Sequence, residues 1–591
     1  MERAEVNSVE EWVEGVSAIT EPDRVVYCNG SREEYESIIR EMVADGSLIK
    51  LNQKKFPGGY LSRSDPRDVA RTEKSTFICA DNESDAGPLN NFMSLEKADS
   101  ITEKLMKGSM RGKTMYVVPY IMGPVSSPYS ETGVEITDNP YVVVNMHIMT
   151  RMGDVAMERI NKTGEFVRAI HISGNLDPEN RYILHFPWKR LGIDAHIISI
   201  NSAYGGNALL SKKCHALRIA TVEARNDGWM AEHMLILEVE NPEGKKYYFA
   251  AAFPSASGKT NLAMIKPPEE YTKIGWKARL IGDDIAWMHV GKDGRLYAIN
   301  PENGFFGVVP GTSETTNPNA MESIRKDTIF TNVALTEDDE PWWEGLPPPK
   351  GELVDWKGNH HSLSTREKAA HPNSRFTTPL RRYPSLSDEV ENPEGVPITA
   401  ILFGGRRGDT VPLIYESFDW KHGVFLGATM GVEQTAAAEG QVGVVRRDPM
   451  AMRPFCGYNI SHYFDHWLSM EDEASNLPKI YYVNWFRRDK NGNFIWPGFG
   501  DNIRVLEWII GRSEGTAPAR ETPLGYMPDH GSLNYQGLDL TREQKEKLFK
   551  VDYGEWGSEI SEIEEFIRSL GKEVPSEIKN QVTKLRERMG I

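Results

Sequence analysis

The sequence predicts a mixed α/β protein of more than one domain, one of which contains a strand, a phosphate-binding loop and a helix in succession. At 591 residues the chain is too long for one ordinary domain, and length alone suggests about two to four. Short β-rich runs recur between residues 114 and 200, and amphipathic helical patterns begin and end the chain. The stretch "YYFAAAFPSASGKTNLAMI" supplies the strand, loop and helix.

Taken in order, residues 1 to about 60 have a helical, amphipathic pattern, as in "REEYESIIREMVADGSLIKL". The β-rich runs are "TMYVVPYI", "YVVVNMHIM", "RYILHFPW" and "AHIISINS", separated by turn residues. The segment 340–396 is rich in Pro, Glu and Trp and is predicted to be irregular. The last 30 residues predict one or two surface helices.

Composition excludes several classes of function. The net charge of −17 argues against a sequence-independent nucleic-acid binder and against a protein of anionic membranes, since both need a basic surface. Four scattered cysteines without a C-x-x-C pair fit a reducing compartment. The first residues lack the apolar core of a secretory signal, and we find no run of about 18 apolar residues. We therefore expect a cytoplasmic protein with no nucleic-acid and no membrane partner.

Gly258-Lys259-Thr260 matches the end of a P-loop, although Phe253-Pro254 stands where the loop's first glycine belongs. The residues between strand and helix are small or turn-forming, which lets backbone N–H groups converge on phosphate oxygens. Lys259 would neutralise phosphate charge and Thr260 would ligate Mg²⁺. The alternative is a chance GKT behind a buried strand, and the strand–loop–helix setting favours the phosphate site.

A predicted hairpin brings a histidine to this loop. "EHMLILEVENPEGKKYYFAAAF" places Pro242 and Gly244 in a type I turn, and pairing Glu240 with Lys245 sets His233 opposite Ala252. His233 is then a candidate metal ligand at the mouth of the loop, with a satisfied structural histidine as the equal alternative.

Two carboxylates end the next predicted strand, in "ARLIGDDIAWM". Asp283 and Asp284 repel each other if both are buried, unless a cation lies beside them. Metal-holding acids of P-loop enzymes occupy such strand ends. A turn acid that caps a helix explains one Asp but less easily two.

Guanidinium groups and aromatic rings supply the remaining candidates. Arg71, Arg375 and Arg406 lie in or beside loops rich in Gly, Pro or Asn, where they can bind anions; surface salt bridges are the alternative. Lys212-Lys213 first reads as a solvated pair. The stretch "VNWFRRDKNGNFIWPGFGDN" combines an aromatic cluster with turn residues, which fits either a core hairpin or a slot for a flat base.

Together these segments resemble the GTP-dependent phosphoenolpyruvate carboxykinase family. The resemblance runs, in order, through "DPRDVAR", "YGGNALLSKKC", "WMAEHMLIL", "FPSASGKTNLAM", "GDDIAWM", "INPENGFFGVVPGTS", "HPNSRF", "FGGRR", "DPMAMRPFCGYN" and "NWFRRD…WPGFGDN", over about residues 60–510. It implies a two-lobed carboxykinase fold with an N-terminal lobe over 1–225, a P-loop C-terminal lobe over 226–591, and an active site in the cleft between the lobes.

The resemblance also implies the reaction. It is the reversible, gluconeogenic decarboxylation and phosphorylation of oxaloacetate by GTP, which gives phosphoenolpyruvate, GDP and CO₂. One Mn²⁺ per active site and a Mg²⁺ or Mn²⁺ on the nucleotide are implied as cofactors, ITP and IDP as further nucleotides, and a monomer as the working state. Decarboxylation leaves an enolate, whose charge must be stabilised where it develops and kept from water.

Carried over residue by residue, the family's roles fall as follows. The implied catalytic groups are Lys259, Arg406, Arg71 and Ser257, and the metal ligands are Lys213, His233, Asp284 and Thr260. The implied nucleotide site comprises Ser255, Ala256, Ser257, Gly258, Lys259, Thr260, Asn261, Arg406, Trp485, Phe486, Phe494, Phe499 and Asn502. The implied substrate site comprises Arg71, Tyr204, Gly205, Gly206, Ser255, Asn373 and Arg375. A mobile lid is implied over Glu433–Gly443, around Ala437.

One position departs from the family, which usually carries a reactive cysteine where this chain has Ser257. That places thiol-reagent inactivation in doubt but not catalysis, since no step requires a thiolate. Two other readings remain: a different metal-dependent P-loop phosphotransferase, such as a small-molecule kinase, and a nucleotide-binding regulator without turnover. The first does not explain Lys213 and His233 or the carboxylate-directed arginines.

Overall fold

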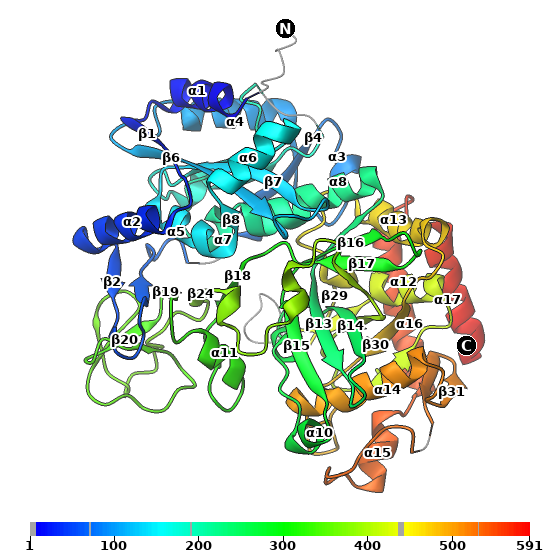
Figure 1. The fold of residues 1–591 in the computed structure, drawn as a ribbon. Coiled ribbons are helices and arrows are strands. Elements are labelled where there is room, and N and C mark those ends of the chain that lie inside the picture. The colour runs from blue at the N-terminus through cyan, green and yellow to red at the C-terminus, as the bar shows by residue number, and fades with distance from the viewer. Residues whose placement is uncertain (1–7, 70–71, 189–191, 435–442, 530) are drawn as a thin grey trace. The chain divides into compact units, whose positions relative to one another are not determined.

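The computed structural model describes residues 8–69, 72–188, 192–434, 443–529 and 531–591. The chain forms two compact units (Figure 1). Unit 1 comprises Met1–Ala86, Asn91–Val222 and Pro301–Leu386, and unit 2 comprises Gly87–Asn90, Glu223–Asn300 and Ser387–Ile591. Within the described part of the chain, no helix has both the length and the apolar character that crossing a membrane requires.

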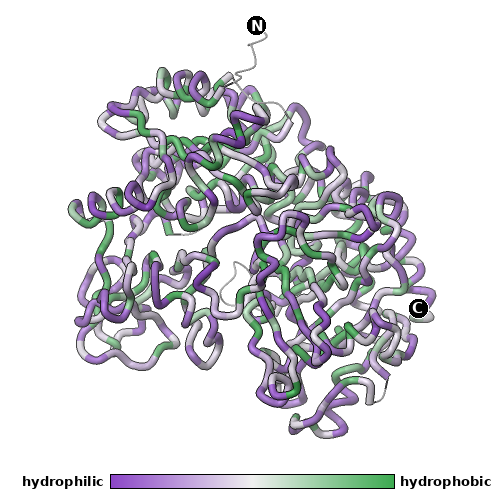
Figure 2. Tube along the Cα trace, viewed as in Figure 1, coloured by the Kyte–Doolittle hydropathy of each residue, from purple (hydrophilic) through white to green (hydrophobic). Residues whose placement is uncertain are grey.

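A nine-stranded mixed sheet is the centre of unit 1, in the order β1-β6-β7-β9-β11-β10-β4-β5, with β8 beside β6. Helices α1 (Val9–Thr20) and α4 (Leu95–Met106) pack apolar residues such as Trp12 and Met106 into its core. The strands are β1 Arg24–Tyr27, β4 Thr76–Ala80, β5 Phe92–Ser94, β6 Thr114–Met122, β7 Glu131–Thr137, β8 Arg151–Met152, β9 Val167–Ile172, β10 Tyr182–His185 and β11 Ile197–Ile200. The strands consist mainly of hydrophobic residues, and polar residues are concentrated in the connections between them (Figure 2).

A second sheet explains why residues 301–386 pack with unit 1. Its order is β18-β24-β19-β3-β2, so strands from this late segment pair with strands near the N-terminus. The strands are β2 Leu48–Lys50, β3 Tyr60–Ser62, β18 Gly304–Val308, β19 Ile329–Thr331 and β24 Arg375–Pro379. The division of the chain into domains 1–225 and 226–591 stays a prediction, because the units follow packing and not a single cut.

One predicted strand is wrong. "YVVVNMHIM" forms α5 (Pro140–Met149) and not a β-strand, whereas "TMYVVPYI", "RYILHFPW" and "AHIISINS" contain β6, β10 and β11 as predicted. Asn139 caps α5 through its side chain, which accepts the Tyr141 N–H, and Pro140 takes the first helical position. The helix is buried on almost every side, so its sequence has no polar face to reveal a helical period.

Unit 2 is built on an eight-stranded sheet in the order β15-β13-β14-β26-β30-β27-β32-β31, and β14, β26 and β30 run parallel at its centre. Its strands are β13 Met234–Glu240, β14 Lys246–Ala252, β15 Lys277–Gly282, β26 Ala400–Gly404, β27 Ile414–Glu416, β30 Lys479–Val483, β31 Ala519–Thr522 and β32 Gly525–Pro528. A smaller sheet contains β12 Met230–Glu232, β16 Ala286–Val290, β17 Leu296–Ile299 and β25 Val396–Pro397.

Helices of unit 2 include α12 (Trp420–Ala428), α13 (Ile460–Glu473), α14 (Ile503–Ser513), α16 (Tyr553–Ser569) and α17 (Ser576–Met589). The last two confirm the helical pattern predicted for the C-terminal residues. Segment 340–396 is largely irregular as predicted, with the short strands β21 Pro341–Trp342, β22 Leu353–Val354 and β23 His360–His361.

Candidate active site

The GKT sequence lies in the predicted setting. Strand β14 ends at Ala252, the loop 253–258 follows, and α9 (Lys259–Ala263) begins after it. Ala256 and Gly258 have left-handed φ angles of 60° and 93°, a backbone form in which successive N–H groups can converge on an anion. Ser255, Ala256 and Thr260 are exposed, while Gly258, Lys259 and Asn261 are half-buried. The loop therefore presents backbone, hydroxyl and ammonium groups together.

Lys259, Asp284 and His233 form a chain of contacts beside this loop. The Lys259 Nζ lies 2.5 Å from Asp284 Oδ1, and His233 Nε2 lies 3.0 Å from the same oxygen. All three side chains are largely buried. The structure thus joins three residues that are 25 and 51 positions apart in the sequence.

The second nitrogen of His233 fixes how the ring faces Asp284. Nδ1 lies 2.9 Å from the carbonyl oxygen of Ala451, which can only accept a hydrogen bond, so Nδ1 carries the proton. Nε2 then donates to the Asp284 carboxylate when the ring is protonated, and offers it a lone pair when the ring is neutral, as it is in a metal ligand. Two facing electron-pair donors suit a shared cation, and a histidine whose other N–H binds a backbone carbonyl is the usual arrangement of a metal ligand. These residues therefore fit a divalent metal.

The predicted hairpin register is wrong by one residue. Asn241–Gly244 forms the predicted turn, because the Gly244 N–H bonds to the Asn241 carbonyl, but Gly244 has a left-handed φ of 79° and adds a bulge. Met234 consequently pairs with Ala252, and Glu240 with Lys246. His233 precedes β13 and still reaches the loop region through Asp284.

The other predicted metal ligands differ in their placement. Asp283 and Asp284 directly follow β15, as predicted. Lys213 belongs to unit 1 and is buried in the π-helix η3 (Ser211–Ile219), where Lys212 pairs with Glu302 at 2.6 Å. Lys212 is thus a buried ion-pair partner and not the solvated residue of the simpler interpretation. Among the described residues, no group of three or more His, Cys, Asp or Glu side chains is placed to hold a metal ion.

Unit 1 gathers the residues predicted for the substrate carboxylate. Arg375 donates from Nε to the Tyr204 hydroxyl at 3.2 Å and from Nη2 to Asn373 Oδ1 at 2.8 Å. Gly205 allows Phe306 to approach, since a Cβ there would lie 2.8 Å from that ring. Gly206 follows it in the first turn of α7 (Gly205–Ala208). Arg71 lies outside the described residues.

Arg406 contacts the P-loop through its side chain and its backbone. Its Nε and Nη2 donate to the Ala256 carbonyl at 3.0 and 2.8 Å, and its backbone N–H donates to the buried Ser257 hydroxyl at 3.2 Å. Its guanidinium lies 4.0 Å from the centre of the Phe486 ring, and burial lowers its pKa. Within the described residues, Arg406 makes these contacts with the loop and the ring and forms no ion pair.

The aromatic cluster is part core and part surface. Trp485 and Trp496 are buried, whereas Phe494 and Phe499 are 49% and 51% exposed. Phe486 contacts Phe494 edge to face at 5.6 Å, and a Cβ on Gly258 would lie 3.3 Å from Trp485. Exposed aromatic faces beside the P-loop suit the stacking of a flat base. The core-hairpin alternative explains the two tryptophans but not these two phenylalanines.

The predicted lid begins and ends in a short hairpin. Glu433 ends β28 (Gly431–Glu433), which pairs with β29 (Val445–Arg447), and the Gly443 N–H bonds to the Gln434 carbonyl. Glu433 also accepts the Gly408 N–H at 2.5 Å, and its own N–H donates to the Arg406 carbonyl. Ala437, with residues 435–442, lies outside the described residues.

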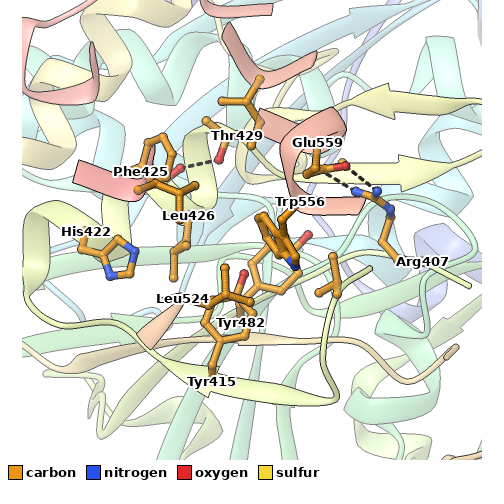
Figure 3. A pocket seen from close by; sticks show the side chains of 14 residues that line it. Arg407, Tyr415, His422, Phe425, Leu426, Thr429, Tyr482, Leu524, Trp556 and Glu559 are labelled. Atoms are coloured by element: carbon orange, nitrogen blue, oxygen red, sulfur yellow. Dashed lines mark hydrogen bonds and ion pairs between the residues drawn. The ribbon is translucent and has the colours of Figure 1, made fainter. Parts of the chain in front are cut away.

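Unit 2 also contains a buried charge cluster that has no signature in the sequence. Arg407 and Arg447 donate to Glu559 at 2.5–2.9 Å. Arg407 and Glu559 line a cavity of about 30 Å³ (Figure 3). Burial alone would raise the pKa of Glu559, but the two arginines outweigh it and lower the pKa to about 2. Nothing in "SEIEEFIRS" distinguishes Glu559 from its acidic neighbours, so only the fold could reveal it.

Unit 2 therefore has the strand, loop and helix of the P-loop class of nucleotide-binding proteins. Two family models divide the chain between them: the phosphoenolpyruvate carboxykinase N-terminal domain matches residues 11–225, and the C-terminal P-loop domain matches residues 229–588.

Curated relatives named "Phosphoenolpyruvate carboxykinase [GTP]" match along their whole length. The protein of Thermoplasma volcanium is 53% identical over 592 residues, which span 100% of this chain and 99% of the relative. That of Anaeromyxobacter dehalogenans is 53% identical over 98% of this chain and 96% of its own. That of Chlamydia abortus is 50% identical over 99% of this chain and 98% of its own. The chain belongs to the GTP-dependent phosphoenolpyruvate carboxykinase family.

Proposed function

We propose that this chain catalyses the reaction of its family, in which oxaloacetate and GTP give phosphoenolpyruvate, GDP and CO₂ in a reversible, gluconeogenic step. The observation that carries the proposal is the contact of His233 and Lys259 with one carboxylate, Asp284, beside the P-loop. A simple phosphotransferase needs the lysine and the acid. It does not require a histidine whose Nε2 lies 3.0 Å from that acid.

We assign the two residue groups to two parts of the chemistry. In unit 1, Tyr204 to Gly206, Asn373 and Arg375, together with Arg71, bind the carboxylates of oxaloacetate. In unit 2, Lys259 and Arg406 hold the γ-phosphoryl group in line for attack by the enolate oxygen. Arginine side chains fit both roles because a guanidinium group can donate two parallel hydrogen bonds to a carboxylate or phosphate group.

Enzymes of this family use a divalent metal. We assign one Mn²⁺ per active site to Lys213, His233 and Asp284, and the nucleotide's Mg²⁺ or Mn²⁺ to Thr260. The metals would supply positive charge at the developing enolate and phosphate oxygens. Lys213 can act as a ligand only as the neutral amine, so the positive charges around it must disfavour its ammonium form.

We assign the exposed aromatic faces to guanine recognition. Phe486, Phe494 and Phe499 would stack the base, Asn502 would read its edge, and Trp485 would support the pocket from beneath. Ser255 to Asn261 would bind the phosphates. ITP shares the 6-oxo group of GTP, so we expect ITP to serve as well. The loop Glu433–Gly443 would act as a lid that keeps water from the enolate.

We further propose that the protein works as a monomer in the cytoplasm. Light scattering of the purified chain tests the first part, and a dimer would contradict it.

The decisive experiment measures CO₂ release and phosphoenolpyruvate formation from oxaloacetate, with Mn²⁺ and GTP, ITP or ATP. We expect turnover with GTP and ITP and little with ATP. Equal rates with ATP would refute the guanine assignment. Nucleotide binding without CO₂ release would instead indicate a regulator, and phosphoryl transfer to another acceptor would indicate a kinase.

A further inference from the structure

A buried hydrogen bond lies under the aromatic cluster and joins Trp496 to Asn502. The indole Nε1–H donates to Asn502 Oδ1 at 2.8 Å, and both residues are only 2% exposed. An indole N–H can donate but cannot accept. The oxygen of the Asn502 amide must therefore face Trp496, and the opposite orientation of the amide is excluded.

Asn502 does not cap the helix that follows it. It is the residue immediately before α14, where an asparagine oxygen normally accepts a backbone N–H of the first helical turn. Here Asn502 ends η7 (Phe499–Asn502) and has a helical backbone, so it makes no such cap, and its oxygen accepts the Trp496 N–H instead. No helix-start bond therefore fixes the amide, and its orientation is set by the indole.

The other end of the amide remains available. Nδ2 carries two N–H groups and donates to no described residue. Asn502 ends the short helix η7 (Phe499–Asn502), which packs against α9 directly after the P-loop. At the start of η7, Phe499 is half exposed with a left-handed φ of 49°, an unfavourable backbone form for a large side chain.

We infer that Trp496 is a specificity-determining positioning residue. Its indole N–H holds the Asn502 amide with the NH₂ group outward, where it donates to the 6-oxo group of guanine and confronts the 6-amino group of adenine with a second donor. The inference rests on the proposed function and names how the same site selects its nucleotide. A site built to satisfy one hydrogen bond rejects analogues that leave its polar groups unpaired.

The first test replaces Trp496 by Phe, which keeps an aromatic ring but removes the N–H. Released from the indole, the amide can rotate, so the ratio of kcat/KM for GTP over ATP should fall about tenfold or more. ITP should follow GTP because both bases carry the 6-oxo group. The loss should fall on the KM for GTP more than on kcat, since the base lies far from the reacting atoms.

Trp508→Phe is the matched control. Trp508 is equally buried and donates its indole N–H to the Pro518 carbonyl, away from every proposed site residue. This variant loses the same kind of bond and should keep the wild-type nucleotide ratio. An unchanged GTP:ATP ratio in soluble, folded Trp496→Phe protein would overturn the inference, as would an equal fall in both variants.

A second variant tests the amide orientation should Trp496→Phe fold poorly. Asn502→Asp keeps the shape and the acceptor for the indole but turns the outward donor into an oxygen acceptor. We expect its preference to move from GTP and ITP toward ATP, and retained GTP preference would contradict the inference. If the wild-type protein itself shows no GTP-dependent turnover, the proposed function fails first, and that outcome is distinct from any change of ratio.

Discussion

At the scale of the residue, single hydrogen bonds determine what each side chain can do. His233 Nε2 faces Asp284 because the Nδ1–H donates a hydrogen bond to the Ala451 carbonyl. Ser257 has a structural contact of its own, since its hydroxyl accepts the Arg406 N–H. All four cysteines are buried, and burial raises the pKa of the Cys79 and Cys456 thiols to about 12. The described structure thus offers thiol reagents no reactive thiolate.

A prediction follows for His233. His233→Ala should abolish turnover and weaken Mn²⁺ binding by about 100-fold or more, because it removes a proposed ligand while leaving the strands intact. Mn²⁺ titration followed by electron paramagnetic resonance measures the affinity, and circular dichroism checks the fold.

His360→Ala serves as its control, since His360 is exposed and pairs only with Glu352 within the described residues. This variant should match the wild-type protein in both measurements. Wild-type activity or Mn²⁺ affinity in His233→Ala would remove His233 from the metal site.

At the scale of the element, hairpins and loop ends position the chemistry. The bulge at Gly244 shifts the whole register of β13 against β14, and the hairpin of β28 and β29 joins the two ends of the proposed lid. Glu433 ties this hairpin to the loop of Arg406 through hydrogen bonds to Arg406 and Gly408. A change in the proposed lid can therefore reach Arg406, the proposed phosphate-binding residue, through these hydrogen bonds.

Shortening the loop between Glu433 and Gly443 should raise the yield of pyruvate relative to phosphoenolpyruvate. The enolate would be exposed to water before phosphoryl transfer, and protonation of its carbon gives pyruvate. Coupled assays with lactate dehydrogenase and with pyruvate kinase measure the two products separately. Removing the same number of residues from the exposed loop 362–368 should leave the ratio unchanged. An unaltered ratio in the lid variant would refute the lid assignment.

At the scale of the whole molecule, a buried ion cluster ties distant segments of unit 2 together. Glu559 on α16 binds Arg407 after β26 and Arg447 at the end of β29, over sequence separations of 152 and 112 residues. The three side chains are buried, so removing the carboxylate would leave Arg407 without its ion-pair partner among the described residues, and would leave Arg447 with only its 3.2 Å contact to Glu562.

Glu559→Gln should lower the stability of unit 2 at pH 7 by about 3 kcal/mol, a typical cost of breaking a buried ion pair. The pKa of Glu559 is about 2 in the folded protein, below the unfolded value of about 4.3. A lowered pKa stabilises the fold above the unfolded value, and this stabilisation is lost as the pH falls toward the folded value. The difference in melting temperature between wild type and variant should therefore narrow between pH 5 and pH 3.

The exposed pair of Arg542 and Glu546 provides the comparison, and Glu546→Gln should change the melting temperature very little at any pH. A pH-independent difference for Glu559→Gln would show that its carboxylate is not the group that titrates.

The order of motifs, the P-loop setting, the paired aspartates and most strands could be predicted because they depend on neighbours in the sequence. The exception among the predicted strands, α5, is instructive. Its uniformly apolar residues fit a buried strand as well as a buried helix, and only packing on all sides distinguishes the two. The predicted pairing of His233 with Ala252 was wrong for a related reason. One residue in a left-handed conformation at the turn, Gly244, shifts every pair of the hairpin by one position.

By itself, the sequence determined the class of fold, the phosphate-binding loop and the family, because strands, turns and motifs depend on local patterns of residues. Tertiary structure alone decided which ring nitrogen of His233 faces Asp284, which end of Asn502 faces outward, and which glutamate pairs with both Arg407 and Arg447. Hydrogen bonds of this kind join residues up to 218 positions apart. Their geometry depends on donors and acceptors that only the folded chain brings within 3 Å of one another.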